Sequence, residues 1–579
     1  METKKKLKSS TAYLFNCYIW LLNTIARGPI SRAAIDEKWA HSSVNEYKQD
    51  YLPETTFHRW RNTVELLFYI TIKCNSQGEY YIDDAKEVNF SEWRTRMVNL
   101  LAVNSLIKDC KTKDISKKTR MANGESSSLP RYKNTHITMK KAVLLILISL
   151  MTSVLHAQEA DTHIASLVNN EEWFALAEDL PQYSDSMQAD YLRLIAEAML
   201  AAHTNRTEEA VAALTKLLSE HQSELGTQTA LNFALLRLQL IGKQGHYAEA
   251  ADGIQRIINQ LESSGVTETQ ALRTLQKHYA VLRNYAPLTV SRPEKDIAAP
   301  FRLIEPQVTK REEWMRGGKK AYKGNLMTIP VLVHGKEYPF IFDTGAGATF
   351  LFEKTAREMG LTILPDTVTV NGSQKGLRAW IDSLQIGEVT CRNVVAYVGL
   401  SDAIDTLMTG MDAILGMDII AAFPETQLHM DKQQLVFPAQ PTPMPQDTKP
   451  NLLIDGSLLL RAKKDSVPLT FHLDTGCSTA ELYSTYYHKF AAETGNTAQK
   501  DTISTLSYGQ IHNMEVLLLP DASFMVGDQP VSMEEVYLYP SSGEYLHQHD
   551  GRMGMDFLRT FNSITINLKD MYLHVEYKE

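Results

Sequence analysis

Two copies of the triplet Asp-Thr-Gly stand 131 residues apart in this chain, each directly after an apolar run. They are Asp343-Thr344-Gly345 and Asp474-Thr475-Gly476. A peptide bond is inert near neutral pH, so attack by water needs both a base and an acid. Two facing carboxylates that share one proton could supply both. We therefore predict that Asp343 and Asp474 form a catalytic pair.

The other residues of each triplet suit the support of such a pair. The hydroxyls and amides of Thr344 and Thr475 could form hydrogen bonds to the opposite loop. Glycine has no Cβ, so Gly345 and Gly476 would let the two loops approach closely. The water itself would be the nucleophile, and the pattern therefore predicts neither a metal nor a cofactor.

A second motif follows each triplet, in residues 414–418 and 552–556. We expect each to be a buried strand whose glycine, Gly416 or Gly554, lets the acidic loop cross it. Asp418 and Asp556 are expected to be N-caps of short helices that begin after them. A repeated half-site with one carboxylate in each half predicts two β lobes, at 322–438 and 450–579. A stiff proline-rich linker at 439–449 would join them.

The strand context and these motifs resemble retropepsin-like and pepsin-like aspartic peptidases. The resemblance covers residues 322–579 and implies two closed, barrel-like β lobes, a peptide or protein substrate and an aspartic-type endopeptidase activity. It also implies a flap hairpin in each lobe, near 371–376 and 507–510. A helix is expected near 352–359 in the first lobe and near 479–493 in the second.

The second half departs from the family pattern. Cys477 follows its glycine where Ala or Ser is usual, and Arg552 places a charge where an apolar residue is expected. These residues leave open an inactive pseudo-peptidase that binds extended peptides by strand addition. They also leave open that the first lobe pairs with its counterpart in another molecule.

Charge divides the chain into two parts. Residues 1–138 carry 22 Lys and Arg against 15 Asp and Glu, a net charge of +7, whereas the remainder has a net charge of −16. This asymmetry suggests parts with different partners. Only Cys391 and Cys477 lie beyond residue 138, which excludes a disulfide-rich scaffold.

Residues 139–157 have the pattern of a secretory signal peptide: Met139, two lysines, a short apolar core and Ala157 before Gln158. The core is short for a membrane span, so no stable span is favoured. We expect translation to begin at Met139 and the product to be exported, to the periplasm or beyond, after cleavage near Ala157. Residues 1–138 would then be a mis-assigned or fused start. The alternative is an uncleaved anchor that tethers a DNA-binding regulator to an exported sensor.

Residues 1–110 suggest a small winged helix-turn-helix segment. Helical spacing near residues 13–25 and 32–39, a helix from Pro53 and a hairpin at 70–82 make up this pattern. The segment resembles the N-terminal part of bacterial WYL-domain transcriptional regulators. Arg59 and Arg61 would contact DNA if residues 1–110 are expressed; the alternative is a small helical domain with a basic surface. Residues 111–138 are expected to be a linker.

Residues 158–286 have apolar residues at helical spacing and a loose repeat that begins at Phe174, Thr207 and Tyr247. The repeat resembles tetratricopeptide helix pairs, and a plain helical bundle is the alternative. Either could bind a protein partner. A linker is expected at 287–321, which makes the fold class multidomain: winged-helix-like, α-helical and mostly β in order.

Overall fold

The structure is a computed structural model. It describes residues 159–577 apart from ten short gaps, and parts of residues 17–83. The gaps are 267–268, 306, 309–319, 322–324, 371–373, 401–407, 410–412, 447, 508–509 and 541–548. The predicted linker at 111–138 and the predicted signal peptide at 139–157 lie outside the described residues. The chain divides into one unit of Met1–Leu144 with Ser223–Thr229, and a second unit of Leu145–Gln222 with Ala230–Glu579.

The first unit contains one helix of defined bounds and a three-stranded antiparallel sheet. These elements are α2 (Arg32–Ala40), β1 (Ile30–Ser31), β2 (Thr71–Cys74) and β3 (Glu79–Asp83). The predicted hairpin is confirmed, and its turn is held by Asn75, whose side-chain oxygen accepts the amides of Gln77 and Glu79. Arg59 lies outside the described residues and Arg61 is half-buried. DNA binding therefore stays a prediction.

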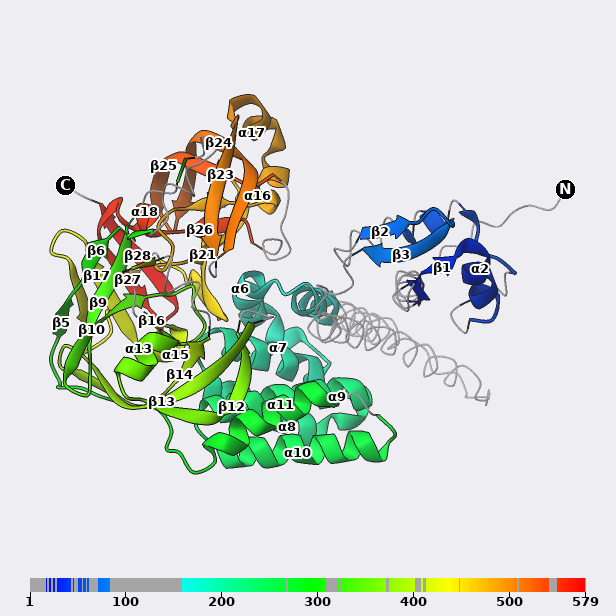
Figure 1. Cartoon of the computed structure of the whole chain (residues 1–579), viewed down its shortest axis with the longest axis horizontal. Coiled ribbons are helices and arrows are strands. Elements are labelled where there is room, and N and C mark those ends of the chain that lie inside the picture. Colours follow the sequence, from blue (N-terminus) through cyan, green and yellow to red (C-terminus); the bar gives the residue numbers. More distant parts are fainter. Residues whose placement is uncertain are drawn as a thin grey trace, which may run out of the picture. The chain divides into compact units, whose positions relative to one another are not determined.

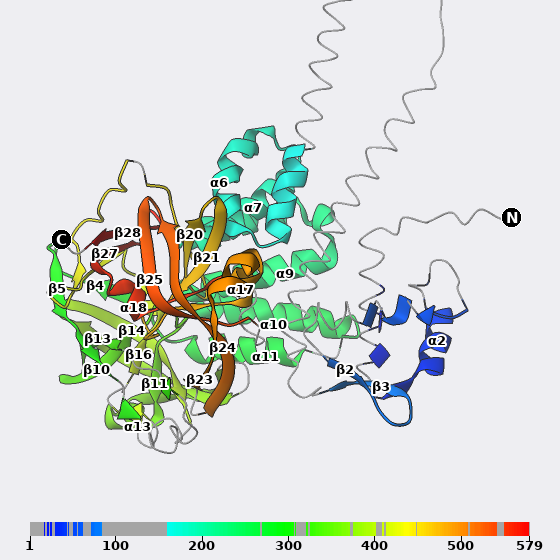
Figure 2. The same ribbon diagram turned by 90° about the horizontal axis from the view of Figure 1, so that it is seen from above.

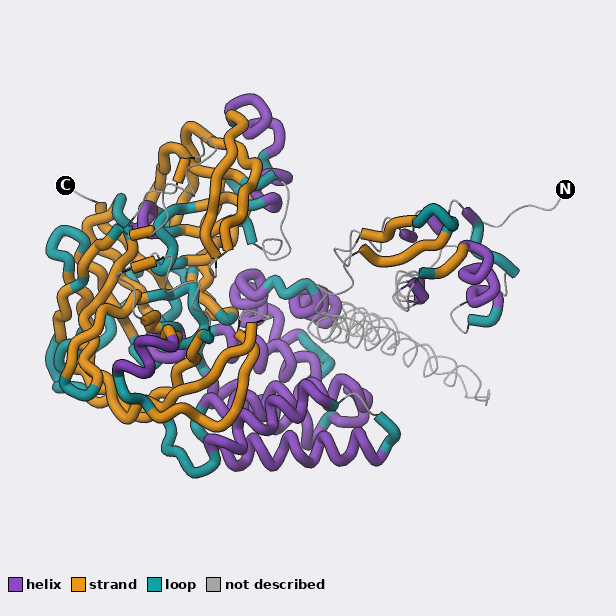
Figure 3. The backbone as a smooth tube through the Cα atoms, in the orientation of Figure 1, coloured by secondary structure: helices purple, strands orange, loops and turns teal. Residues whose placement is uncertain are grey.

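Six helices with defined bounds precede the β-rich part, and they gather apart from the strands (Figure 3). They are α6 (Trp173–Tyr183), α7 (Asp190–His203), α8 (Thr207–Glu220), α9 (Gln222–Lys243), α10 (Tyr247–Ser263) and α11 (Gln270–Leu282). Small residues allow close packing, because a Cβ on Gly253 would collide with Leu238, and Ala210 and Ala250 are fully buried. The helical character is as expected, while the tetratricopeptide assignment stays a prediction. Among the helices that are described, none is long and apolar enough to cross a membrane.

Two nine-stranded sheets carry the triplets (Figures 1 and 2). The first contains β6 (Arg302–Ile304), β9 (Leu326–Val333), β10 (Lys336–Phe342), β11 (Phe350–Phe352), β12 (Thr362–Val370), β13 (Gln374–Ile386), β14 (Val389–Gly399) and β16 (Ala413–Leu415), with β4 (Thr289–Ser291) paired to β14. The second contains β8 (Lys320–Ala321), β19 (Leu452–Asp455), β20 (Ser457–Lys464), β21 (Val467–Leu473), β22 (Glu481–Leu482), β23 (Gln499–Ser507), β24 (Gln510–Val526), β25 (Gln529–Leu538) and β26 (Gly551–Met553).

A third sheet joins the two halves. Its order is β28 (Tyr572–Tyr577), β27 (Phe561–Asn567), β17 (Glu425–His429), β18 (Gln434–Phe437) and β5 (Ile297–Pro300). Strands β17 and β18 come from the first half and β27 and β28 from the second. Strands β4, β5 and β6 all lie within the stretch predicted to be a linker, so this part of the chain is built into the sheets.

The proline-rich segment is fixed to this third sheet through a buried carboxylate. Glu425 accepts the amide and the hydroxyl of Thr442 at 2.8 and 2.7 Å. It also accepts the side-chain amides of Asn567 and Gln427, each at 2.7 Å. A buried charge is tolerated only when its oxygens are hydrogen-bonded, as they are here.

The helical region packs on β12 and β13 of the first half, where Figure 1 shows α11 beside β12. Tyr279 and Leu282 of α11 share one apolar cluster with Leu364 of β12 and Trp380 of β13. Arg378 of β13 is fully buried at this contact. Its guanidinium donates to the carbonyl of His278 at 2.9 Å and to the Asp366 carboxylate. The helices are thus an integral support of these two strands.

Candidate active site

The two predicted aspartates follow strands β10 and β21 directly. The amide of Asp343 donates to the carbonyl of Leu415 at 3.0 Å, and the amide of Asp474 donates to that of Met553 at 2.9 Å. Each aspartate is thereby tied to the strand that carries the second motif of its own half.

That second strand passes between the two strands that flank the triplet. In the first half, β16 runs parallel to β10 and antiparallel to β11. In the second half, β26 runs parallel to β21 and antiparallel to β22. The predicted crossing is therefore present in both halves. A Cβ on Gly416 would collide with the backbone of Ala348, and one on Gly554 with that of Thr479.

Thr344 and Thr475 connect the two loops, and both side chains are fully buried. The amide of Thr344 donates to the Thr475 hydroxyl at 3.0 Å, and the amide of Thr475 donates to the Thr344 hydroxyl at 3.1 Å. Each hydroxyl in turn donates to a carbonyl before the opposite aspartate, that of Leu473 or Phe342. These reciprocal bonds link two chain segments that are far apart in sequence.

The glycines bring the carboxylates together across this contact. A Cβ on Gly345 would collide with the carboxyl group of Asp474, and a Cβ on Gly476 would collide with that of Asp343. Each carboxyl group therefore lies against the opposite loop, and the two aspartates face one another.

Asp343 is held by its own loop and influenced by its partner. Its Oδ1 accepts the amides of Gly345 at 2.8 Å and Ala346 at 3.0 Å. Burial of the carboxyl group, followed by the nearby charge of Asp474, raises the pKa of Asp343 well above its ordinary value. The two amides oppose this shift without cancelling it. Burial and the facing carboxylate thus favour the neutral form of the Asp343 carboxyl group.

Asp474 has a different environment. Its Oδ1 accepts the amide of Gly476 at 3.0 Å, and its Oδ2 lies 3.4 Å from a guanidinium nitrogen of Arg552. The other terminal nitrogen of Arg552 is 2.6 Å from Glu481, which also accepts the hydroxyl of Tyr539 at 3.0 Å. The sequence marked Arg552 as a departure but missed Glu481 and Tyr539. Only the register of β22 on β26 places Glu481 opposite Arg552.

Asp418 and Asp556 are not the N-caps that the sequence suggested. The short helices α15 (Met417–Ile420) and α18 (Met555–Leu558) begin before these aspartates, so Gly416 and Gly554 occupy the N-cap positions. Asp418 accepts the amide and hydroxyl of Thr349, each at 2.9 Å. Asp556 accepts the amide of Ala480 at 2.7 Å. The aspartates fix the loops that follow the triplets.

The predicted flaps correspond to two antiparallel hairpins, β12 with β13 and β23 with β24. Their tips, at 371–373 and 508–509, lie outside the described residues. Helix α13 (Glu353–Glu358) confirms the helix expected in the first half. In the second half the expected helical segment is present but starts later and is divided: β22 (Glu481–Leu482) forms first, and two short helices follow, α16 (Ser484–Lys489) and α17 (Ala491–Thr497).

Cys477 lies beside the pair but is not set up as a nucleophile. Burial raises the pKa of its thiol to about 12, and its Sγ contacts the carbonyl of Thr479 at 3.3 Å. A cysteine needs to be a thiolate to react, and this environment disfavours one. His472 is bonded to the Ser457 hydroxyl at 2.8 Å instead. Within the described part of the chain, no group of three acidic, His or Cys side chains could hold a metal.

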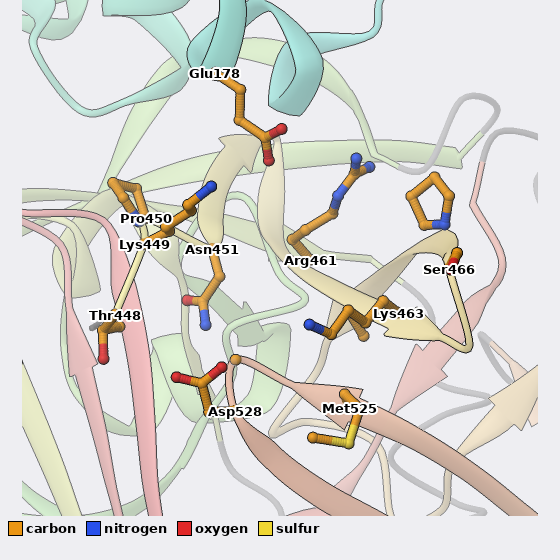
Figure 4. A pocket seen from close by; sticks show the side chains of 13 residues that line it. Glu178, Thr448, Lys449, Pro450, Asn451, Arg461, Lys463, Ser466, Met525 and Asp528 are labelled. Carbon is orange, nitrogen blue, oxygen red and sulfur yellow. The ribbon is translucent and has the colours of Figure 1, made fainter.

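A separate pocket of about 350 Å³ lies between the helical region and the second half (Figure 4). Glu178 of α6 and Arg461 and Lys463 of β20 line it, together with Asn451 and Asp528. The guanidinium of Arg461 is also placed over the ring of Phe174 at 5.4 Å. Neither aspartate of the pair lines this pocket, so it is distinct from the candidate active site.

Comparison with known proteins supports the class that the geometry suggests. Residues 329–419, which include Asp343 and Gly416, match a family model described as Aspartyl protease. A search of curated proteins finds no match. Among solved structures, 315 chains match. One is the aspartic proteinase from Irpex lacteus, with 13% identity over 49% of this chain and 98% of that chain and a TM-score of 0.29. The family match thus shows that residues 329–419 are similar to aspartyl proteases.

Proposed function

We propose that this chain is an aspartic endopeptidase that hydrolyses peptide bonds with water activated by Asp343 and Asp474. The carrying observation is the mutual approach of the two carboxyl groups, each against the glycine of the opposite triplet. The reciprocal bonds of Thr344 and Thr475 support it, because they fix that approach from both loops.

The chemistry follows from one shared proton. Two carboxyl groups this close repel one another when both are ionised. The pair therefore titrates as a unit and shares one proton. The ionised carboxylate accepts a proton from water while the oxygen of that water forms a bond to the scissile carbonyl carbon. The neutral carboxyl gives its proton to the carbonyl oxygen. The resulting diol collapses as the C–N bond breaks. The carboxyl that took up the water proton gives it to the leaving amine, and a diol hydroxyl returns its proton to the other carboxylate, which restores the starting pair.

The test is cleavage of a mixed peptide library by the purified full chain from pH 3 to 8, beside Asp343→Asn and Asp474→Asn. Loss of cleavage in both variants, by about 10²–10⁴-fold for lost acid–base catalysis, supports the proposal. Loss in Asp343→Asn alone supports pairing of two first halves from different molecules. Absence of cleavage by the parent at every pH contradicts the proposed activity.

One observation favours a second candidate function. The guanidinium of Arg552 lies 3.4 Å from Asp474, and a pair blocked in this way would leave a pseudo-peptidase that binds extended peptides by strand addition. Peptide binding without cleavage, retained in Asp474→Asn, would identify this function.

Export belongs to the same proposal and rests on residues 139–157. Their short apolar core and the Ala157-Gln158 junction support cleavage of a signal peptide. Mass spectrometry of the native N-terminus tests it: a terminus at Gln158 supports an exported product whose helical region is available to a protein partner. A terminus at Met1 supports instead the membrane-tethered regulator, with Arg59 and Arg61 facing DNA.

A further inference from the structure

The two halves differ at one pair of facing strand positions. In the first half, Phe350 of β11 lies opposite Ile414 of β16. In the second half the same register places Glu481 of β22 opposite Arg552 of β26. An apolar pair beside one aspartate is thus replaced by an ion pair beside the other.

The surroundings differ to match this exchange. The ring of Phe350 lies against Gly399, where a Cβ would collide with it. The corresponding position in the second half is Tyr539, two residues beyond the residue that pairs with Glu481. Its hydroxyl donates to Glu481 at 3.0 Å. Three equivalent positions therefore differ together: they form an apolar contact in the first half and a hydrogen-bonded charge network in the second.

The network reaches the carboxylate pair. Glu481 is buried, with a side chain 7% exposed, and its Oε2 lies 2.6 Å from Nη2 of Arg552. The Arg552 side chain is 30% exposed, and its Nη1 lies 3.4 Å from Oδ2 of Asp474, whose side chain is 14% exposed. Glu481 therefore holds the guanidinium in place through Nη2, and Nη1 of Arg552 is directed toward the carboxylate of Asp474.

We propose that Arg552, anchored by Glu481, is a positioning residue that keeps the negative charge of the pair on Asp474. Asp343 is then the neutral member that donates to the scissile carbonyl, and Asp474 is the base that accepts the proton of water. This inference rests on the proposed peptidase function and adds to it a fixed division of roles. The guanidinium 3.4 Å from Asp474 supports it, and the raised pKa of Asp343 has the same direction.

The other titratable groups near Asp474 do not reverse this assignment. Asp343 faces it from the opposite loop, and Cys477 and Tyr483 are two further titratable side chains beside it. Burial raises the pKa of the Cys477 thiol to about 12 and raises the pKa of the Tyr483 hydroxyl above its ordinary value, so both are neutral across the working range. His472 lies near Arg552, and burial lowers its pKa to about 3, so it is neutral above that pH. Arg552 and Glu481 remain the charged neighbours.

The experiment compares pH profiles of kcat/KM for the full chain and three variants. A cation within about 4–6 Å lowers the pKa of a carboxyl group by about 1–3 units. Arg552→Met should therefore move the acidic limb of the kcat/KM profile to higher pH by about 1–3 units. Arg552→Lys should restore most of the parent profile. Glu481→Gln should move the acid limb to lower pH, because it leaves the positive charge of Arg552 unopposed; a shift to higher pH would contradict the inference. Arg559→Met, an exposed arginine bonded to Asn325 at 3.0 Å, is the matched control and should leave the profile unchanged.

A profile of Arg552→Met that superimposes on the parent overturns the inference, as does activity that rises at every pH. Activity that rises at every pH would mean that Arg552 inhibits catalysis by the pair. Thermal unfolding checks that each variant folds, and Glu481→Gln supplies the test if Arg552→Met does not.

A parent without activity would overturn the proposed function but would leave the charge assignment testable. Carboxyl-¹³C-labelled aspartate, assigned with Asp343→Asn and Asp474→Asn, reports the ionisation of each group by NMR. The expected result is an Asp474 signal of the ionised form at pH 5 that moves toward the protonated form in Arg552→Met. An Asp474 signal that is indifferent to Arg552 would overturn the assignment.

Discussion

Thr344 and Thr475 each accept a hydrogen bond from the other's backbone amide, at 3.0 and 3.1 Å, across 131 residues of sequence. Both are fully buried, and each hydroxyl also donates to a carbonyl of the opposite strand. The two halves of the candidate site are thus one hydrogen-bonded structure, and neither loop is held by its own half alone.

Thr344→Val should therefore lower stability and activity together. Valine has nearly the same shape but leaves the Thr475 amide and the Leu473 carbonyl without this partner. Each unpaired buried group costs about 1–3 kcal/mol, so the free energy of unfolding should fall by roughly 2–6 kcal/mol, as urea denaturation would measure.

Thr426→Val is the matched control. Thr426, in strand β17, is fully buried like Thr344, but its hydroxyl has no hydrogen-bond partner among the described residues. This substitution should be neutral or stabilising. A loss equal to that of Thr344→Val would show that the cross-links of the two loops are not the cause.

Gly345→Ala should abolish cleavage. Its methyl group would collide with the carboxyl group of Asp474 and separate the pair. Gly495→Ala is the control, since a Cβ there meets nothing within 4 Å and the residue lies in helix α17. It should raise the free energy of unfolding by about 0.5–1 kcal/mol and leave kcat/KM unchanged. Retained activity in Gly345→Ala would contradict the close approach of the loops.

Asp418→Asn should stabilise the protein at neutral pH and not at pH 4. Burial raises the pKa of Asp418 to about 6, so the folded state binds this proton more tightly than the unfolded state does. The free energy of unfolding therefore falls as the pH rises from about 4 to about 6, by about 2–3 kcal/mol at 1.4 kcal/mol per pKa unit. Asparagine at this position keeps an acceptor oxygen for Thr349, but it does not titrate, so the variant does not lose this stability as the pH rises.

Urea denaturation of both proteins at pH 4 and pH 7 measures this difference. Asp556→Asn should change stability with the same sign, because burial raises the pKa of Asp556 as well. A difference between Asp418→Asn and the parent that does not grow with pH would contradict the assigned ionisation.

Arg378→Met should be strongly destabilising. It would leave Asp366, which is buried and has one oxygen already without a hydrogen bond among the described residues, as an uncompensated charge. Removing one member of a buried pair costs about 3–5 kcal/mol. Arg357→Met is the control, because Arg357 is 74% exposed in its pair with Glu353 and should cost at most about 1 kcal/mol.

The same variant tests whether the helices support the strands that lead to the first hairpin. Hydrogen exchange in β12 and β13 should rise in Arg378→Met, since the guanidinium also holds the carbonyl of His278 in α11. Unchanged protection of these strands would mean that the apolar contact of Trp380 and Tyr279 suffices.

Much of the site could be predicted because its signals are local. An Asp-Thr-Gly triplet after an apolar run and a glycine motif some 70–80 residues later are readable without any knowledge of packing. The hairpin at Asn75 and the helix of Glu353–Glu358 were predictable for the same reason, from turn chemistry and spacing. The helix expected from Thr479 begins only at Ser484, because pairing of Glu481 with Arg552 places the first part of that segment in a sheet.

The sequence by itself determined the repeat, the two carboxylates and the small residues that let loops meet, because these are properties of residue type and order. Only the tertiary structure decided that Glu481 faces Arg552 and that Arg552 reaches Asp474. It also decided that the guanidinium of Arg378 in β13 donates a hydrogen bond to the carbonyl of His278 in α11, 100 residues earlier. Strand register and the docking of distant elements follow from the packing of the whole core, so no local pattern specifies which charges meet.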